Sequence, residues 1–380
     1  MQYREVGNTG KKAGIIGLGA EHLDGKPYAQ VKETIDAALA GGVNIMDVFM
    51  PGSEVRKNIA KALGMRRHEV MIQGHIGSSD VAQQYDISRD MPTVRKYFDE
   101  ILRIFDGYID FGMLFFIDSQ EHYDGVFETP FIEYAQKLKA EGKIGHIGFS
   151  SHNPEMAAKV VRTGLVESMM FSINLAFDMH PAEKNVLDAL DKGLGAALSH
   201  RIDAKRAALY SLCEEKGVGI TVMKAYGAGK LLSTEQSPFG TPMTAAQCLH
   251  YALTRPAVAA VLPGCKTATE MEAALGYLNA TAEQRGYAHV LDAAMDDFRG
   301  SCVYCSHCQP CPAEIDIAAV HQYLDIAQLD KQNIAGTIRR HYAALSHHAE
   351  ECIACGNCES RCPFGVPIIA NMEAAAHIFQ

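Results

Sequence analysis

Short apolar runs alternate along roughly the first 280 residues with longer segments of helical periodicity. The apolar runs carry hydrophobic residues on both faces, which is typical of the buried strands of a parallel sheet covered by helices. Eight such runs occur, at residues 13–20, 43–48, 70–77, 108–118, 144–150, 167–177, 218–226 and 258–264. A helical segment follows each run, and the first one, Tyr28–Ala40, is stopped by Gly41 and Gly42. Eight strand-then-helix units of this length predict an α/β fold of the (β/α)8 TIM barrel type.

An open, doubly wound sheet is the alternative that this pattern allows. A G-x-G-x-x-G turn after a strand would favour it, and the chain has only Gly17-Leu18-Gly19. One connection, from Asp178 to Ile202, is longer than the others. On a barrel it follows the sixth strand at the carboxyl end, where active sites form, so we expect either a substrate lid or a surface insertion there.

Two cysteine runs set the last part of the chain apart. The spacings are C-x2-C-x2-C-x2-C-P for Cys302, Cys305, Cys308 and Cys311, and C-x2-C-x2-C-x3-C-P for Cys352, Cys355, Cys358 and Cys362. The second spacing is the bacterial ferredoxin pattern for 4Fe-4S ligation, in which the fourth cysteine usually binds the other cluster. Structural zinc would need pairs rather than two runs of four, and disulfide frameworks belong to small secreted chains. Eight ligands predict two 4Fe-4S clusters. The shorter last spacing of the first run leaves open which cubane Cys311 and Cys362 serve.

Helical periodicity on both sides of the first cysteine run predicts a second, smaller domain. The helical segments are Glu283–Arg299, Ala318–Gln328 and Ile334–Ala349. We therefore expect the barrel to cover residues 1–285 and a small helical ferredoxin-like domain with two 4Fe-4S clusters to cover residues 286–380.

Composition limits the partners of the chain. Hydrophobic residues make up 48% of its 380 residues, enough for a sizeable core. The net charge of −10 and the lack of a long basic run argue against nucleic acid or an anionic membrane surface as partner. There is no 18-residue apolar run, and the first residues lack the apolar core of a signal peptide. We expect a cytoplasmic chain in a reducing, oxygen-poor compartment.

Six segments, taken in order, resemble the strand motifs of the aldo-keto reductase family over roughly residues 1–280. They read GIIGLGA, VNIMDVFMPGSE, YIDFGMLFFID, KIGHIGFSS, MKAYGAGKLL and AVLPGCKTATEME. The two cysteine runs resemble the C-terminal extension of the iron–sulfur branch of that family. The resemblance implies NADPH-dependent carbonyl reduction, in which a tyrosine protonates the alkoxide while an aspartate, a lysine and a histidine tune and polarise the site.

The same resemblance implies that the family's catalytic tetrad is degenerate in this chain. Asp47 matches the family aspartate. The tyrosine, lysine and histidine positions fall on Pro51, His75 and Phe115. Because proline and phenylalanine cannot transfer protons, we do not expect ordinary alcohol–ketone reduction by the family mechanism.

The cofactor site implied by the resemblance is partly eroded. Ser150 matches a residue that holds the nicotinamide amide, but serines replace the family asparagine at Ser151 and glutamine at Ser172. Glu270 stands where an arginine for the 2′-phosphate is expected. The candidate cofactor-binding residues are Ser150, Ser172, Gly227, Gly229, Gly264 and Lys266. The identity of the cofactor remains open. The barrel could bind NADP(H), a flavin held by its phosphate at the last two barrel loops, or neither.

Other polar residues are expected to face the barrel mouth and to carry the chemistry instead: His22, Asp47, His75, Asp118, Ser150, His152, Asp178, Lys224 and Tyr226. Asp47 and His75 come from neighbouring strands, and a carboxylate beside an imidazole gives a proton donor near neutral pH. Lys224 and Tyr226 form a second candidate donor pair, although Lys224 alternatively neutralises Asp47. A metal site built from His22, His75 and Asp47 has no supporting spacing motif.

These observations predict an iron–sulfur oxidoreductase that passes electrons through two 4Fe-4S clusters. The electrons would reach or leave a small-molecule substrate, or a second cofactor, at the barrel mouth, and a redox protein is a candidate partner. Two alternatives remain: an electron-relay or scaffold protein with a retired barrel, and an NADPH-dependent carbonyl reductase with rearranged proton donors.

Overall fold

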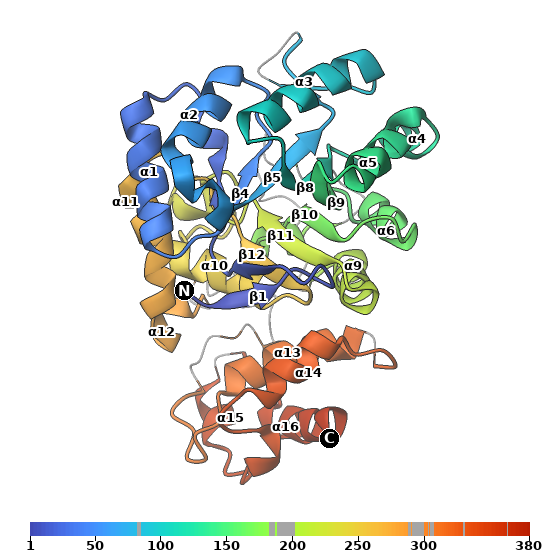
Figure 1. Cartoon of the computed structure of the whole chain (residues 1–380). Coiled ribbons are helices and arrows are strands. Elements are labelled where there is room, and N and C mark those ends of the chain that lie inside the picture. The colour runs from blue at the N-terminus through green and yellow to red at the C-terminus, as the bar shows by residue number, and fades with distance from the viewer. Residues whose placement is uncertain are drawn as a thin grey trace.

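The computed structural model describes residues 1–380 except 82–84, 182–186, 188–201, 288–289, 291–299, 303, 305–307, 330 and 363. A barrel of strands wrapped by helices forms the larger part, and a helical part carrying the end of the chain lies against one end of it (Figure 1). No helix in the described ranges is long and apolar enough to cross a membrane.

Eight parallel strands form the barrel. They are β3 (Leu18–Gly19), β4 (Ile45–Val48), β5 (Met71–Ile76), β8 (Ile109–Leu114), β9 (Ile144–Ser151), β10 (Ser168–Ser172), β11 (Gly219–Met223) and β12 (Val258–Val261), paired in this order. Bridges from Ile16 to Val261 and from Gly19 to Gly264 join the first strand to the last. The (β/α)8 prediction is therefore confirmed, and the open-sheet alternative is wrong.

The inside of the barrel is filled by large apolar side chains. Phe111, Met113 and Met170 are at most 4% exposed and belong to this inner cluster. One polar pair crosses the interior, where Gln73 Nε2 donates to Thr221 Oγ1 at 3.0 Å. A second, larger cluster lies between the strands and the helices. Burial on both faces explains why the strands appear as nearly continuous apolar runs in the sequence.

Helices wrap the outside of the strands (Figure 1). They are α1 (Tyr28–Ala40), α2 (Ser53–Leu63), α3 (Met91–Ile104), α4 (Gln120–Phe127), α5 (Pro130–Ala140), α6 (Pro154–Arg162), α9 (Ala204–Lys216), α10 (Ala245–Leu253) and α11 (Ala268–Leu275). Side-chain caps fix several starts. Asn153 accepts from two backbone N–H groups at the start of α6, and Thr244 with Gln247 forms a capping box on α10.

A short hairpin closes the amino end of the barrel, and sequence analysis did not predict it. Its strands are β1 (Tyr3–Glu5) and β2 (Lys12–Gly14). Arg4 Nη1 donates to the carbonyls of Leu253 and Val258 at 2.8 and 3.0 Å, in the connection from α10 to β12. Helix-to-strand connections lie at the end of the barrel opposite its mouth, so the hairpin lies there too.

The C-terminal part is built from short helices and cysteine-bearing loops. After α12 (Ala282–Arg285) come α13 (Ile317–Leu329), α14 (Gly336–Ala343), α15 (Asn357–Arg361) and α16 (Ile368–Phe379). The rings of Tyr342 and Phe379 stack with centroids 4.1 Å apart. The helix predicted over 334–349 is shorter, because the chain turns after Ala343 and Tyr342 Oη accepts the N–H of Ala349. Most of the helix predicted after residue 285 falls on residues 288–289 and 291–299, outside the described residues.

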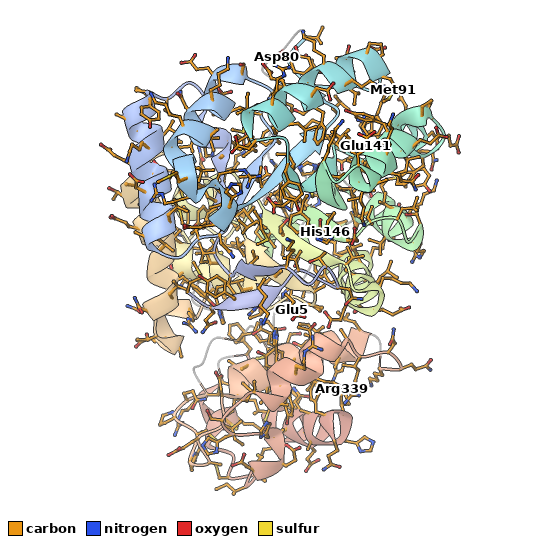
Figure 2. The ribbon with its side chains drawn as sticks, viewed as in Figure 1. Glu5, Asp80, Met91, Glu141, His146 and Arg339 are labelled. Carbon is orange, nitrogen blue, oxygen red and sulfur yellow. The ribbon has the colours of Figure 1, made fainter. Side chains whose placement is uncertain are left out.

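The C-terminal helices dock on the amino end of the barrel. Gln322 of α13 donates to Thr254 Oγ1 at 2.6 Å, and Arg340 of α14 lies 3.2 Å from Glu214 of α9. Figure 2 labels Glu5 on the barrel hairpin and Arg339 on α14, on the two sides of this boundary. Catalytic groups of such barrels lie at the mouth. The cysteine-bearing part therefore covers the opposite end.

Candidate functional site

Asp47 and His75 form a buried pair at the carboxyl end of the barrel. β4 and β5 are neighbours, and His75 Nε2 lies 2.7 Å from Asp47 Oδ1. Asp47 is 4% exposed and His75 is 2% exposed. Because a carboxylate accepts, Nε2 carries the proton that it donates. Nδ1 has no partner among the described residues. Nδ1 is therefore the atom of this imidazole that is left for a contact with a bound molecule.

Aromatic rings surround this imidazole. The His75 ring centroid lies 5.3 Å from Phe115 and 6.0 Å from Phe49, and the two phenylalanines stack on one another. Tyr85 packs edge-on against both phenylalanines at 5.4 and 6.2 Å. Tyr85 is 40% exposed, and partial burial raises the pKa of its phenol. Sequence analysis missed Tyr85, because its loop follows the third barrel strand and no motif marks it.

A second histidine–carboxylate pair follows the ends of the adjoining strands β8 and β9. His152 Nδ1 is 2.8 Å from Asp118 Oδ2, and Ser151 Oγ donates to Asp118 Oδ1 at 2.9 Å. Burial works against ionisation of Asp118, but the charge of His152 and the hydrogen bonds from His152 and Ser151 lower the pKa of the carboxyl below its usual value. The sequence placed both residues at the mouth without predicting that they pair.

The second predicted donor pair is not assembled with the first. Lys224 makes no ion pair with Asp47 among the described residues, so it does not neutralise that carboxylate there. Tyr226 packs against the outer core, and the charged or titratable groups nearest its phenol include Cys265 and Cys248. Burial raises the pKa of this phenol well above its ordinary value. A role for Lys224 or Tyr226 stays a prediction.

Asp178 does not lie at the mouth as expected. The strand predicted over 167–177 ends at Ser172, because Asn174 caps a short helix, α7 (Leu175–Asp178), that carries Asp178 away from the strand. The carboxylate is fully buried, 2.9 Å from Arg206 Nε and 2.6 Å from Tyr210 Oη. It is a structural counter-charge on the outer side of the barrel wall. Most of the predicted lid, residues 182–186 and 188–201, lies outside the described residues.

The predicted nucleotide positions fit a dinucleotide only in part. Ser150 Oγ accepts a hydrogen bond from the N–H of Phe116 at 2.9 Å, whereas Ser172 Oγ is buried without a partner among the described residues. Glu270 accepts the N–H of Lys266 at 2.6 Å. Where the resemblance implies binding of a 2′-phosphate, the Glu270 carboxylate would weaken that binding by like-charge repulsion.

Glycines shape the two loops around these positions. Gly227 and Gly229 have φ of +56° and +86°, the left-handed region that favours glycine. At Gly264 an added Cβ would come within 2.7 Å of His22 Cδ2, so close packing of His22 requires that glycine. No three His, Cys, Asp or Glu side chains in the described part of the chain converge as ligands of one metal ion, so the alternative site from His22, His75 and Asp47 is not assembled there.

Four cysteines line an apolar cavity between the second run and the end of the first. They are Cys311, Cys352, Cys355 and Cys358, with Ile315, Ile317, Ile368 and Met372 among the apolar residues around them. Each ligand of a cubane binds a different iron, so four thiols around an apolar cavity fit a 4Fe-4S cluster. The structure thus brings Cys311 to the second run rather than to its own.

Cys362 lies beside the first run instead. Its neighbour Arg361 donates through Nη1 to the carbonyls of Cys308 and Pro310 at 3.3 and 2.8 Å. The N–H of Gly300 donates to the carbonyl of Phe364 at 2.7 Å. These contacts tie the residues on both sides of Cys362 to the chain near Cys302 and Cys308. Cys305 lies outside the described residues.

The fold and the site together define a (β/α)8 barrel with a buried histidine–aspartate pair at its mouth and a cysteine-rich helical domain at the other end. The chain belongs to the aldo/keto reductase family, whose model matches residues 15–247. A 4Fe-4S binding domain matches residues 346–368 and confirms the cluster class for the second run.

Individual relatives are distant. The uncharacterized oxidoreductase YqkF of Bacillus subtilis (strain 168) is 26% identical over 188 residues, which are 48% of this chain and 59% of that relative. Among solved structures, the holo form of aldo-keto reductase AKR11C1 from Bacillus halodurans superposes with a TM-score of 0.60 at 20% identity, covering 77% of this chain and 96% of that one. A putative aldo-keto reductase from Pseudomonas aeruginosa has a TM-score of 0.55 at 18% identity, covering 73% and 96%. The solved structures support the fold.

Proposed function

We propose that this chain is an iron–sulfur oxidoreductase that moves electrons singly between two 4Fe-4S clusters and a small molecule at the barrel mouth. The observation that carries the proposal is the position of Cys311, which lines one cavity with three cysteines of the second run. Contacts of Arg361 and Phe364 with the first run support the reverse placement of Cys362, and so an exchange of fourth cysteines between the runs. That exchange is the ligand arrangement of two-cluster ferredoxins. When bound, the clusters would supply one-electron oxidation and reduction.

Two complete ligand sets follow from this exchange. Cluster one would be held by Cys302, Cys305, Cys308 and Cys362, and cluster two by Cys311, Cys352, Cys355 and Cys358. Cys355 is exposed, so cluster two is the one that a redox protein partner would approach. Cluster one lies nearer the barrel, because Tyr304 of its loop packs against Tyr287, which in turn packs on Tyr251 of α10.

Proton transfer at the mouth is assigned to His75, positioned by Asp47. Nδ1 of His75 has no partner in the described part of the chain, and the aromatic rings around it would limit access of water. The hydroxyl of Ser172, also without a partner among those residues, would donate to a bound molecule. The remaining candidates for binding NADP(H) or a flavin are the loop residues Gly227, Gly229, Gly264 and Lys266.

The position of the cysteine-rich domain favours one alternative, an electron relay that uses the barrel for docking. The domain lies against the amino end of the barrel (Figure 1), so the clusters would lie at the end opposite the Asp47–His75 pair. An electron relay would not need a substrate-binding site at the barrel mouth. The two functions differ in whether a compound that binds near His75 is oxidised or reduced.

Anaerobic purification followed by iron, sulfide and cofactor analysis tests the proposal. We expect about eight iron and eight sulfide per chain, the content of two cubanes. Cys311→Ala and Cys362→Ala should each reduce the iron content by about half, and the matched control Cys265→Ala, a buried cysteine outside both runs, should not.

Two results would contradict the proposal. A content of about four iron atoms in the wild type would show that the chain holds one cubane, and would rule out cluster one. Full iron content without any compound, organic cofactor or reduced nicotinamide that exchanges electrons with the clusters in a His75-dependent manner would favour the relay instead. His75→Asn is the variant that separates these readings, because it removes the proton-exchanging nitrogen without touching a cysteine.

A further inference from the structure

The cavity of the second cysteine run reaches the surface of the molecule at one edge. Ile353, which follows Cys352, lines the cavity and is nevertheless 66% exposed. Cys355 lines it too and is also exposed. Ala354 between them is exposed and has a φ of +51°, in the left-handed region. This loop therefore presents an apolar side chain and a proposed cluster ligand where another protein can reach them.

The charged residues next to the lining residues of this cavity are all acidic. The positions directly before or after a lining residue hold five carboxylates and no lysine, arginine or histidine. We call these five residues the acidic rim: Glu314, Asp316, Glu351, Glu359 and Glu373. Four of them are exposed, and Glu359 is partly exposed. Negative charge therefore lies on each of the three chain segments that enclose the cavity.

Two basic side chains lie close to the acidic rim. His347 lies 2.8 Å from Glu351 and 3.4 Å from Glu314, and these carboxylates raise the pKa of its imidazole. Arg361 donates to the carbonyl of Pro310 in the first run at 2.8 Å. With both of these groups charged, the five rim carboxylates still leave three negative charges in excess. A cubane held by four thiolates is itself an anion and would add to this excess.

We propose that this surface is the docking site of a one-electron redox protein whose own contact surface is basic. Ile353 is the apolar centre of the contact, and the acidic rim attracts lysine and arginine side chains of the partner. Protein interfaces place a polar rim around an apolar centre, and complementary charges speed association even where the interface is small. One electron passes between the partner and the cluster of the second run, so one is oxidised, the other is reduced, and no covalent bond changes.

Two other occupants fit this surface less well. A second copy of the chain would bring its acidic rim against the first, and like charges placed opposite one another repel. An acidic electron carrier would meet the same repulsion. The inference deepens the proposed function and rests on the part of it in which the second run holds a cluster. It uses neither the cluster of the first run nor the barrel mouth.

Anaerobic stopped-flow measurement of electron transfer from the full-length protein, reduced with dithionite and then desalted, tests the inference. The probes are native cytochrome c, which is a basic haem protein, cytochrome c with acetylated lysines, and the acidic haem protein cytochrome b5. Each haem accepts one electron from a cluster. We expect the second-order rate constant for native cytochrome c to fall about tenfold between about 20 mM and about 0.5 M salt. Acetylation should remove most of this dependence, and cytochrome b5 should react faster at high salt.

Variants with reversed charges locate the contact. Glu314→Lys combined with Glu373→Lys should lower the rate constant for native cytochrome c about tenfold at low salt and leave it unchanged at high salt. The matched control, Glu133→Lys combined with Glu272→Lys, changes two exposed glutamates on the barrel helices α5 and α11 and should keep the wild-type rate. Ile353→Ser should lower the rate at both salt concentrations, because it removes the apolar centre. Iron analysis of each variant shows whether its clusters are retained.

The outcomes separate the inference from the proposed function. Rates that do not depend on salt, equal rates for native and acetylated cytochrome c, or an equal loss in the control variant would overturn the inference. A dimer at low salt that Ile353→Ser abolishes, measured by analytical ultracentrifugation, would also overturn it. If a variant lost its iron, the comparison of native with acetylated cytochrome c on the wild type would still decide. A wild type with about four iron atoms would contradict the two-cluster function without affecting this test, which needs only the cluster of the second run.

Discussion

Acidification is expected to destabilise the barrel through His250, a histidine of α10 that the fold keeps neutral. Its Nδ1 lies 3.2 Å from Tyr277 Oη, and burial together with neighbouring positive charges lowers its pKa to about 4. Those charges belong to Arg285, Arg255 and Arg4. An unfolded histidine has a pKa of about 6.5. As pH falls below 6.5 the unfolded chain binds the proton first, so the stability due to neutral His250 is lost as pH approaches 4.

The size of the effect follows from the two pKa values. Between pH 7 and pH 5, His250 alone should lower the free energy of unfolding by about 2 kcal/mol. In His250→Gln, the amide can still bond to Tyr277 but does not titrate, so the variant should lose about 2 kcal/mol less than the wild type over this interval. His341, whose pKa burial also lowers to about 4, is present in both chains and cancels in the comparison.

Urea unfolding at pH 7 and pH 5, followed by far-ultraviolet circular dichroism under anaerobic conditions, measures this difference. The chain has no tryptophan, so circular dichroism replaces the usual fluorescence. Equal losses of stability in the wild type and in His250→Gln would refute the reasoning. A control at pH 8, where His250 is neutral in both states, should show the same difference between the two chains as at pH 7.

Two further outcomes test other features. Iodoacetamide should leave Cys213 and Cys248 unmodified in the folded protein, because burial raises the thiol pKa of Cys248 to about 12 and that of Cys213 further. Peptide mass spectrometry after cluster removal measures the modification. If either cysteine were modified as fast as the exposed Cys355, the expectation would be contradicted. Gly227→Ala should cost about 1–2 kcal/mol of stability in thermal unfolding, because a left-handed residue would acquire a Cβ 3.1 Å from Leu231, whereas Gly276→Ala, at negative φ with open space around it, should be neutral or slightly stabilising.

The barrel was predictable because its strands are buried on both faces and its helices have clear stops. Tyr28–Ala40, for example, begins and ends where the sequence predicts. The strand predicted over 167–177 failed where a short apolar run was ambiguous: Leu175–Asp178 is buried as a helix that Asn174 caps. The strands of the β1–β2 hairpin have three residues each, too short to show an alternation.

The candidate site was predictable only where strand order decides it. Asp47 and His75 meet because they lie near the ends of neighbouring strands. The ring of Tyr85 over the mouth depends on the path of a loop, which periodicity does not encode. The exchange of Cys311 into the second run likewise depends on how two loops fold together. Spacing alone established the cluster class but not the partner of each fourth cysteine.

Because the cysteine-rich domain docks on the amino end of the barrel, the proposed binding sites for a redox protein and for a small molecule lie on different parts of the surface. The cysteine-rich part lies against the amino end of the barrel (Figure 1), whereas Asp47 and His75 lie at the carboxyl ends of β4 and β5. A redox protein at one end and a small molecule at the other would not compete for space. Under the proposed function, the two could be bound at the same time, and electrons would have to pass along the length of the barrel wall.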